Sequence, residues 1–216
     1  MKITSILVQG GLVVVIVAAA IVGVRETQKH VNSTGQTALT AVGSAATGEK
    51  VALDEFTVNI FTGQGAITGL TVPNSDIGSS PTSFVLDNAK VEIVPWSILW
   101  GPLHIKSIAI TNPSIDLETT ATSSNLAVIL AAAGAYALTA DKSDGDDKKL
   151  RVDNLTITGA KLSGKIYPLS TKMSLTMPDI KMDNMGADGE GMTQADFVQA
   201  VLTQVVNQAM TSAISP

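Results

Sequence analysis

The hydrophobic pattern of this 216-residue chain changes its period along the sequence. Residues 3–24 are almost entirely apolar, residues 26–50 are small and polar, and apolar and polar side chains alternate from residue 51 onward. Alternation with a period of two predicts half-buried strands, and the Gly- and Pro-rich stretches between them predict turns. The pattern therefore predicts a mainly β domain over 51–192 with few helices, built as a curved, bulged antiparallel sheet with an apolar concave face.

The apolar stretch 3–24 contains no charged side chain. At ~1.5 Å per residue a helix over it would be roughly 33 Å long, which is enough to cross a ~30 Å hydrocarbon core. We predict a transmembrane anchor over residues 1–25. A cleaved signal peptide is the alternative, because the alanines at 18–20 would suit a cleavage site after an apolar run.

Three other segments have helical features. Residues 26–50 form a linker or a short helix around 34–46, and the sequence leaves both open. The apolar stretch 124–138 predicts a helix too short to span a bilayer, which packs over the sheet or contacts a membrane. Residues 193–216 predict an amphipathic helix that begins at a Thr193 cap and has an uncharged polar face after Asp196. Such a face packs against the fold or against a partner protein.

Two segments of the predicted sheet share an irregularity. The alternation of 103–117 slips by one residue near Ser107, and that of 150–164 slips at the matching place, 47 residues later. A β-bulge produces such a slip, because an extra residue turns the later side chains back to the same face. We interpret the two segments as an internal strand repeat, in which Ile115 corresponds to Leu162.

Composition and charge mainly exclude functions. The net charge of −5 and the pI near 4.9 argue against nucleic-acid binding, which needs clustered Lys and Arg. The chain has no cysteine and only two histidines, His30 and His104, each expected to be a solvated side chain. No catalytic, cofactor-binding or metal-binding constellation is evident. We therefore expect a protein that is not an enzyme and that needs no cofactor.

Apolar side chains near the C-terminus are the candidate contacts for lipid or a partner protein. Methionine is an adaptable apolar side chain, and five methionines lie between residues 173 and 192. Ordinary core packing is the alternative for all of them. The candidate contact residues are Met173, Met177, Met182, Val198, Val201 and Val205.

Short motifs in a fixed order carry a family resemblance. In chain order they are Thr47-Gly48-x-x-Val51, Gly63-x-Gly65-x-Ile67-x-Gly69-Leu70-x-Val72-x-Asn74, Val91-x-Ile93, Ser97-Ile98-Leu99-x-Gly101-Pro102, Ile105-x-x-Ile108-x-Ile110-x-x-Pro113-x-Ile115, Ser124-Asn125-Leu126 and Leu175-x-Met177-Pro-Asp-Ile180. Together with the apolar N-terminus, this order resembles a short member of the AsmA-like family of bacterial envelope proteins.

The resemblance implies a single-pass protein of a bacterial inner membrane with its β-rich domain in the periplasm. It decides the orientation, because the basic residues Lys2, Arg25 and Lys29 flank both ends of the predicted anchor. It also implies an apolar groove that shelters acyl chains. The expected function is lipid handling or envelope maintenance, with membrane lipid as the partner. The alternative is a structural accessory subunit of a larger membrane complex, docked through its transmembrane and C-terminal helices.

Overall fold

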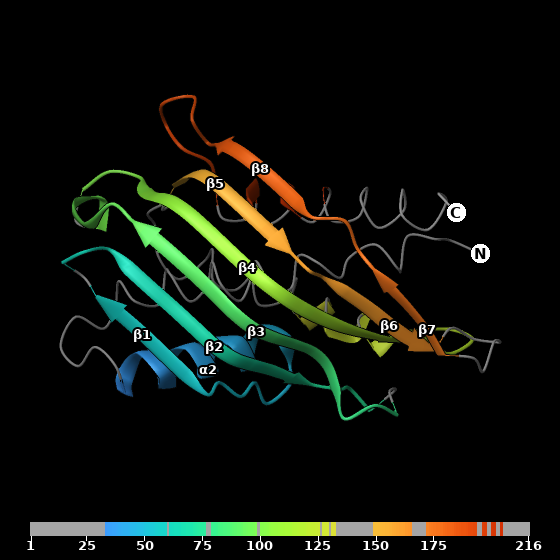
Figure 1. The fold of residues 1–216 in the computed structure, drawn as a ribbon. Helices are drawn as coiled ribbons and strands as arrows, with labels where there is room; N and C mark the ends of the chain where they lie inside the picture. The colour runs from blue at the N-terminus through green and yellow to red at the C-terminus, as the bar shows by residue number, and fades with distance from the viewer. Residues whose placement is uncertain are drawn as a thin grey trace.

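The computed structural model describes residues 33–59, 61–76, 79–98, 100–125, 127–129, 131–132, 149–165, 172–193, 196–197, 200–201 and 204. Their elements, shown in Figure 1, are α2 (Ser33–Thr47), β1 (Glu55–Asn59), β2 (Gln64–Pro73), β3 (Thr82–Ile93), the 3-10 turn η2 (Pro95–Ile98), β4 (Leu103–Glu118), β5 (Leu150–Thr158), β6 (Lys161–Lys165), β7 (Lys172–Thr176) and β8 (Ile180–Met185). The predicted anchor over 1–25 lies outside these residues. No helix among the described residues is long and apolar enough to cross a bilayer.

The strands form one eight-stranded sheet, which confirms the expectation of a mainly β fold. Its main path is β1-β2-β3-β4-β5-β8, and β6 pairs with β4 and β7. The expectation of an antiparallel sheet was wrong, because β4 runs parallel to both β5 and β6. The sheet is therefore mixed.

The parallel pairing joins the two segments of the predicted repeat. Leu103 pairs with Leu150 and Ile115 with Leu162, so the segments lie side by side at a constant offset. Residues 119–149 return the chain to the start of β5, and parallel neighbours need such a long crossover. The first part of this crossover is helical at the described residues between 125 and 132, within the stretch where the pattern predicts a helix.

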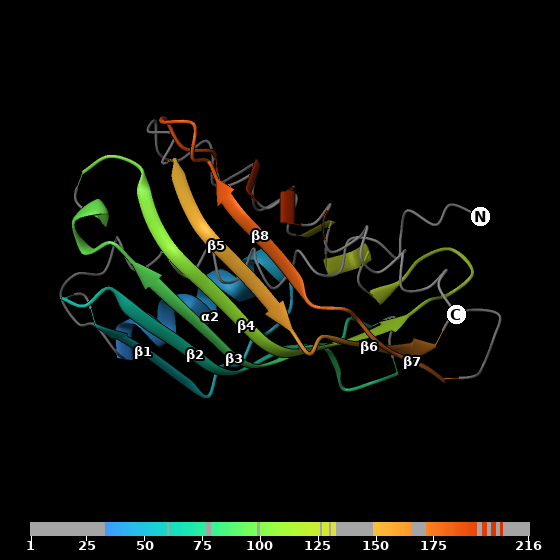
Figure 2. The ribbon, with the colours of Figure 1, turned by 45° about the horizontal axis from the view of Figure 1, so that its top comes forward.

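A bulge and a crease shape the sheet. Opposite Glu92 and Ile93, β4 contains one extra residue, Lys106, next to the predicted bulge position. The second feature, which we call the crease, is a row of residues with positive φ across neighbouring strands. It consists of Gly69, Asn112 and Gly159, with φ values of 66°, 51° and 65°. A Cβ at Gly159 would lie 2.3 Å from Asn112 Oδ1, so this position requires glycine. The sheet curves strongly along its strands (Figure 2).

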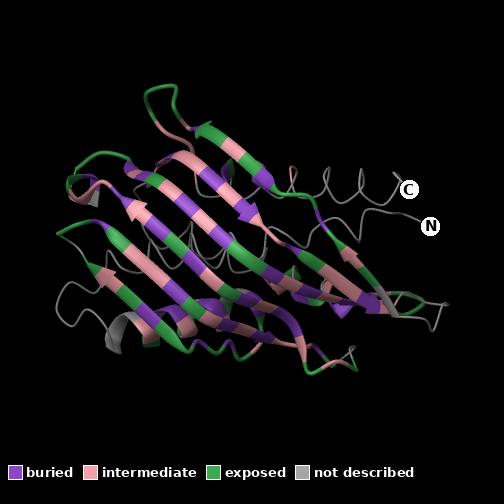
Figure 3. Ribbon diagram, viewed as in Figure 1, coloured by how far each residue is buried: buried purple, intermediate pink, exposed green. Residues whose placement is uncertain are grey.

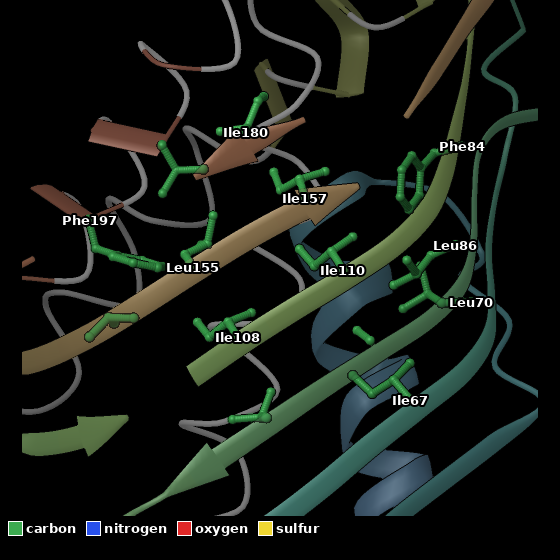
Figure 4. Close-up of a cluster of buried hydrophobic side chains, with 14 of the residues drawn as sticks. Ile67, Leu70, Phe84, Leu86, Ile108, Ile110, Leu155, Ile157, Ile180 and Phe197 are labelled. Atoms are coloured by element: carbon green, nitrogen blue, oxygen red, sulfur yellow. The ribbon is translucent and has the colours of Figure 1, made fainter. Parts of the chain in front are cut away.

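One face of the sheet forms the hydrophobic core. Buried and more exposed residues alternate along the strands as stripes (Figure 3). Figure 4 shows core side chains from five strands on the same face, together with Phe197, and each labelled side chain is at most 4% exposed. At about 1.5–3 kcal/mol for each fully buried large aliphatic side chain, this face dominates the stability of the fold.

Helical segments cover that face. The segment for which the sequence left helix and linker open contains α2, whose Leu39 belongs to the core. Ile129 of the crossover and Val201 near the C-terminus belong to the same cluster and are 0% exposed. The Asp196 N–H donates to Thr193 Oγ1 at 3.1 Å, as a capping residue requires. The apolar face therefore packs against the chain's own helical segments.

Candidate functional site

The structure describes the side chains of three of the six candidate contact residues. Met177 and Val201 are buried in the core at 4% and 0% exposure, and Met182 is partly buried against it. Met173 lies in β7 and pairs with Gly164, without a described side chain. Val198 and Val205 lie outside the described residues. The two buried side chains therefore present no free surface to a ligand in this conformation.

A cluster of polar side chains lies at the end of β4. We call it the polar cluster, and it consists of Asn74, Ser79, Ser80, Asp116, Glu118 and Asn125. At its centre, Asn125 is 0% exposed and uses both ends of its amide. Its Oδ1 accepts from the Glu118 N–H at 3.0 Å, while its Nδ2 donates to Asn74 Oδ1 and to the Asp116 carbonyl, both at 2.8 Å. This amide therefore ties the start of the crossover helix to β4 and to the turn after β2.

The Glu118 carboxylate gathers donors from a distant turn. It accepts hydrogen bonds from the Ser79 N–H, from the Ser79 hydroxyl at 2.9 Å and from the Ser80 N–H at 2.9 Å. Burial acts to raise the pKa of the Glu118 carboxyl, but these hydrogen bonds outweigh it, so the pKa lies below its ordinary value. Lys165 of β6 reaches the same hydroxyl, with its Nζ 3.3 Å from Ser79 Oγ. The carboxylate therefore acts as a cap that fixes the turn before β3.

A second set of polar side chains joins β4 and β5. His104 Nε2 lies 2.7 Å from Asp153 Oδ2, and Arg151 Nε donates to Asp153 Oδ1 at 2.9 Å. The His104 hydrogen bond is the largest influence on the pKa of Asp153 and lowers it, with a further contribution from Arg151. His104 was expected to be simply solvated, but it is 31% exposed and paired. The repeat in the sequence does indicate that these residues are neighbours. Its offset aligns His104 with Arg151, and Asp153 follows two residues later.

The opposite end of β4 carries exposed aromatic side chains. Phe61 lies in the β1–β2 turn, and Trp96 and Trp100 lie in the β3–β4 turn. They are 89%, 70% and 70% exposed, whereas the other three phenylalanines of the chain, Phe56, Phe84 and Phe197, are buried. We call Phe61, Trp96 and Trp100 the aromatic tip. Both turns lie at the same end of the sheet in the two ribbon views (Figures 1 and 2).

Backbone contacts hold the two turns of the aromatic tip together. The Ile93 N–H donates to the Gly63 carbonyl at 2.7 Å, and a Cβ at Gly63 would lie 1.9 Å from the Ile93 carbonyl oxygen. The Ser97 hydroxyl donates to the Val94 carbonyl at 2.7 Å and accepts from the His104 N–H at 2.9 Å. The tryptophan rings stack with centroids 6.5 Å apart and planes inclined by 19°. The exposed rings therefore stand on a fixed backbone.

The pattern of the sequence did not identify either end of β4 as a candidate site. The polar cluster joins residues from several separate segments, so no spacing along the chain indicates it. The aromatic tip did leave a signal, since residues 60–63 and 94–102 contain no charged residue and include both tryptophans. Within the described part of the chain, no three His, Asp or Glu side chains gather as a metal site would require.

No protein-family model matches the chain, and no curated protein matches it.

Proposed function

We propose that this chain is a membrane-anchored protein of the bacterial envelope that serves as a structural accessory subunit of a larger membrane assembly. The apolar stretch 3–24 supports the anchor, and the resemblance to AsmA-like proteins supports a periplasmic location. Between the two functions left open by the sequence, the state of the apolar face favours the structural one.

The observation that carries this choice is the burial of the concave side of the sheet. The side chains of β2, β3, β4 and β5 labelled in Figure 4 are at most 4% exposed, because helical segments of the same chain pack over them. An acyl chain bound in a groove of the sheet would have to contact these same apolar side chains. With the face already covered, the large apolar side chains left for contacts among the described residues are chiefly those of the aromatic tip, with Val128 more weakly exposed.

Native mass spectrometry of the full chain, extracted from its own membrane in mild detergent, tests the proposal. We expect a stable assembly heavier than a single chain, with no phospholipid retained in defined stoichiometry by the β domain. A lone chain that carries bound phospholipid would overturn the structural function.

Lipid handling is the second candidate, and one observation favours it. The cover over β5 and β8 includes Phe197 and Val201, which follow a loop whose Gly186, Gly189 and Gly191 all have positive φ values. A C-terminal segment that lifts from this loop would uncover the core side of β5 and β8, including Leu155.

The same mass measurement separates the two candidates through a matched pair of variants. Met182 of β8 is partly buried against the core, and its neighbour Lys181 is exposed on the other side of the strand. If the uncovered face binds lipid, Met182→Gln reduces the bound phospholipid while Lys181→Gln leaves it unchanged. Equal lipid content in both variants contradicts lipid binding at this face.

A further inference from the structure

We propose that the aromatic tip inserts into the interfacial layer of the membrane that anchors the chain, so that the β domain stands end-on on that membrane. This inference rests on the membrane anchor of the proposed function but not on the choice between assembly and lipid handling. It assigns a lipid-contact site to Phe61, Trp96 and Trp100.

The chemistry of the two turns fits a lipid interface. Residues 60–63 and 94–102 carry no charge and present two tryptophans and a phenylalanine to solvent. Tryptophan combines a large apolar ring with one N–H donor, and it is enriched where headgroups meet acyl chains. The turns also offer no Lys or Arg that would select an anionic nucleic acid or an acidic protein.

The direction of α2 places the predicted anchor on the side of the aromatic tip. Gln36, in the first turns of α2, donates from Nε2 to the Leu53 carbonyl at 2.8 Å, and Ser44, further along the helix, accepts at Oγ from the Val51 N–H at 2.9 Å. Therefore α2 runs antiparallel to the segment that enters β1. Because β1 runs toward the aromatic tip, α2 runs away from it. Its first residue, Ser33, consequently lies toward the end of the sheet that carries the tip (Figures 1 and 2).

The length of the intervening chain limits the distance to the membrane. Residues 25–32 separate the apolar stretch 3–24 from α2. At a maximum of ~3.3–3.6 Å per residue, they can span at most about 29 Å. A bilayer crossed by the apolar stretch therefore lies within that reach of Ser33. Because the bilayer lies this close to the end of the sheet that carries the aromatic tip, we infer that the tip contacts lipid and not a separate protein.

The fixed backbone favours insertion energetically. The two turns are joined through the Ile93 to Gly63 hydrogen bond, and Ser97 closes the base of the second turn. Aromatic side chains that are already ordered lose little conformational freedom when they enter a second environment. Insertion then gains free energy from the removal of the apolar ring surface from water.

The fluorescence of the full chain tests the inference, because Trp96 and Trp100 are the only two tryptophans in the sequence. The chain is reconstituted in vesicles of phosphatidylcholine and phosphatidylglycerol, with and without bromine on the acyl chains. We expect emission shifted to the blue, strong quenching by the brominated lipid and protection from aqueous iodide. Emission typical of water, full quenching by iodide and no effect of bromine would overturn the inference.

A tryptophan at the other end of β4 provides the matched control. Thr122, an exposed residue in the turn after β4, is replaced by Trp in a Trp96→Phe/Trp100→Phe background. We expect this Trp to respond to iodide and not to brominated lipid. Equal bromine quenching of Thr122→Trp and the wild type would show that the domain does not stand on its tip.

An alkaline wash of the vesicles and the iodide quenching together show which part of the inference fails. A chain that leaves the vesicles in an alkaline wash refutes the membrane anchor and thereby the proposed function. A chain that stays integrated while its tryptophans remain open to iodide refutes only the insertion of the tip. Protection from iodide in the native membrane without quenching in brominated vesicles also overturns insertion and identifies a protein as the occupant.

Discussion

At one end of β4 the chain exposes Trp96 and Trp100, whereas at the other end it buries Asn125 and most of Glu118. Both arrangements reverse the usual distribution of apolar and polar side chains. These two residues are hydrogen-bonded to each other and to the segments that contain Asn74 and Ser80, so they stabilise the fold. The exposed rings stack on each other, and under the proposed insertion the membrane covers them. Stability and interaction are therefore assigned to opposite ends, and substitutions should separate them.

The largest effect on stability is expected at the centre of the polar cluster. Asn125→Ala removes three hydrogen bonds and leaves buried groups without partners, at a cost of about 2–4 kcal/mol in the free energy of unfolding. Asn88→Ala is the control, because Asn88 Nδ2 makes a single exposed contact of 3.5 Å with Thr68 Oγ1. Denaturant titration of the full chain in mild detergent, followed by circular dichroism, measures both. Equal costs for the two variants would contradict a stabilising role for the polar cluster.

A smaller effect is expected from the charge of Glu118, and it depends on pH. Glu118→Gln weakens charge-assisted hydrogen bonds from Ser79 and Ser80, which lowers the free energy of unfolding by about 1–3 kcal/mol at neutral pH. The pKa of Glu118 in the folded chain lies below its ordinary value of 4.5. The stabilisation is therefore complete above the ordinary value and is lost as the pH falls through the lower folded pKa.

Denaturant titrations of wild type and Glu118→Gln from pH ~7 down to ~3 measure this dependence. We expect the difference in unfolding free energy between the two proteins to shrink as the pH falls. A difference that stays constant over this range would show that the carboxylate charge does not stabilise the turn.

The sequence predicted the elements of the sheet better than its connections. The slip near Ser107 marked the bulge that the structure has at Lys106, and the alignment of Ile115 with Leu162 matches their pairing. The parallel direction of β4 and β5 was missed, because a half-buried strand shows the same alternation whichever way its neighbour runs.

Neither end of β4 could be fully predicted from local pattern. Glu118 and Ser79 meet only after the sheet has formed, and no periodicity joins residues 39 positions apart. The tryptophans follow a predicted strand in an apolar turn, and apolar composition alone favours burial over exposure. Val201 shows the same limit, since a helical stripe indicates that a face is covered but not which surface covers it.

The contact between His104 and Asp153, near the aromatic tip, should contribute less to stability than the polar cluster. A double-mutant cycle of His104→Ala and Asp153→Ala should give a coupling energy of about 0.2–1 kcal/mol, since the side chains are 31% and 33% exposed. The control cycle uses Lys106 and Glu92, which are 49% and 42% exposed and should couple more weakly. Thermal unfolding monitored by circular dichroism measures both cycles. A stronger coupling in the control pair would contradict the link between burial and strength.

The smallest effect on stability is expected at the aromatic tip itself. Trp96→Ser/Trp100→Ser removes two rings that are each 70% exposed, so the free energy of unfolding should change by no more than about 0.5 kcal/mol. The membrane contact should nevertheless be lost. A single cysteine at exposed Thr62, labelled with an environment-sensitive dye, reports it, because the chain has no other cysteine. We expect the dye to move from a lipid-like to an aqueous signal in the double variant. A large loss of stability, or an unchanged dye signal, would show that the two ends of β4 are not divided between stability and interaction.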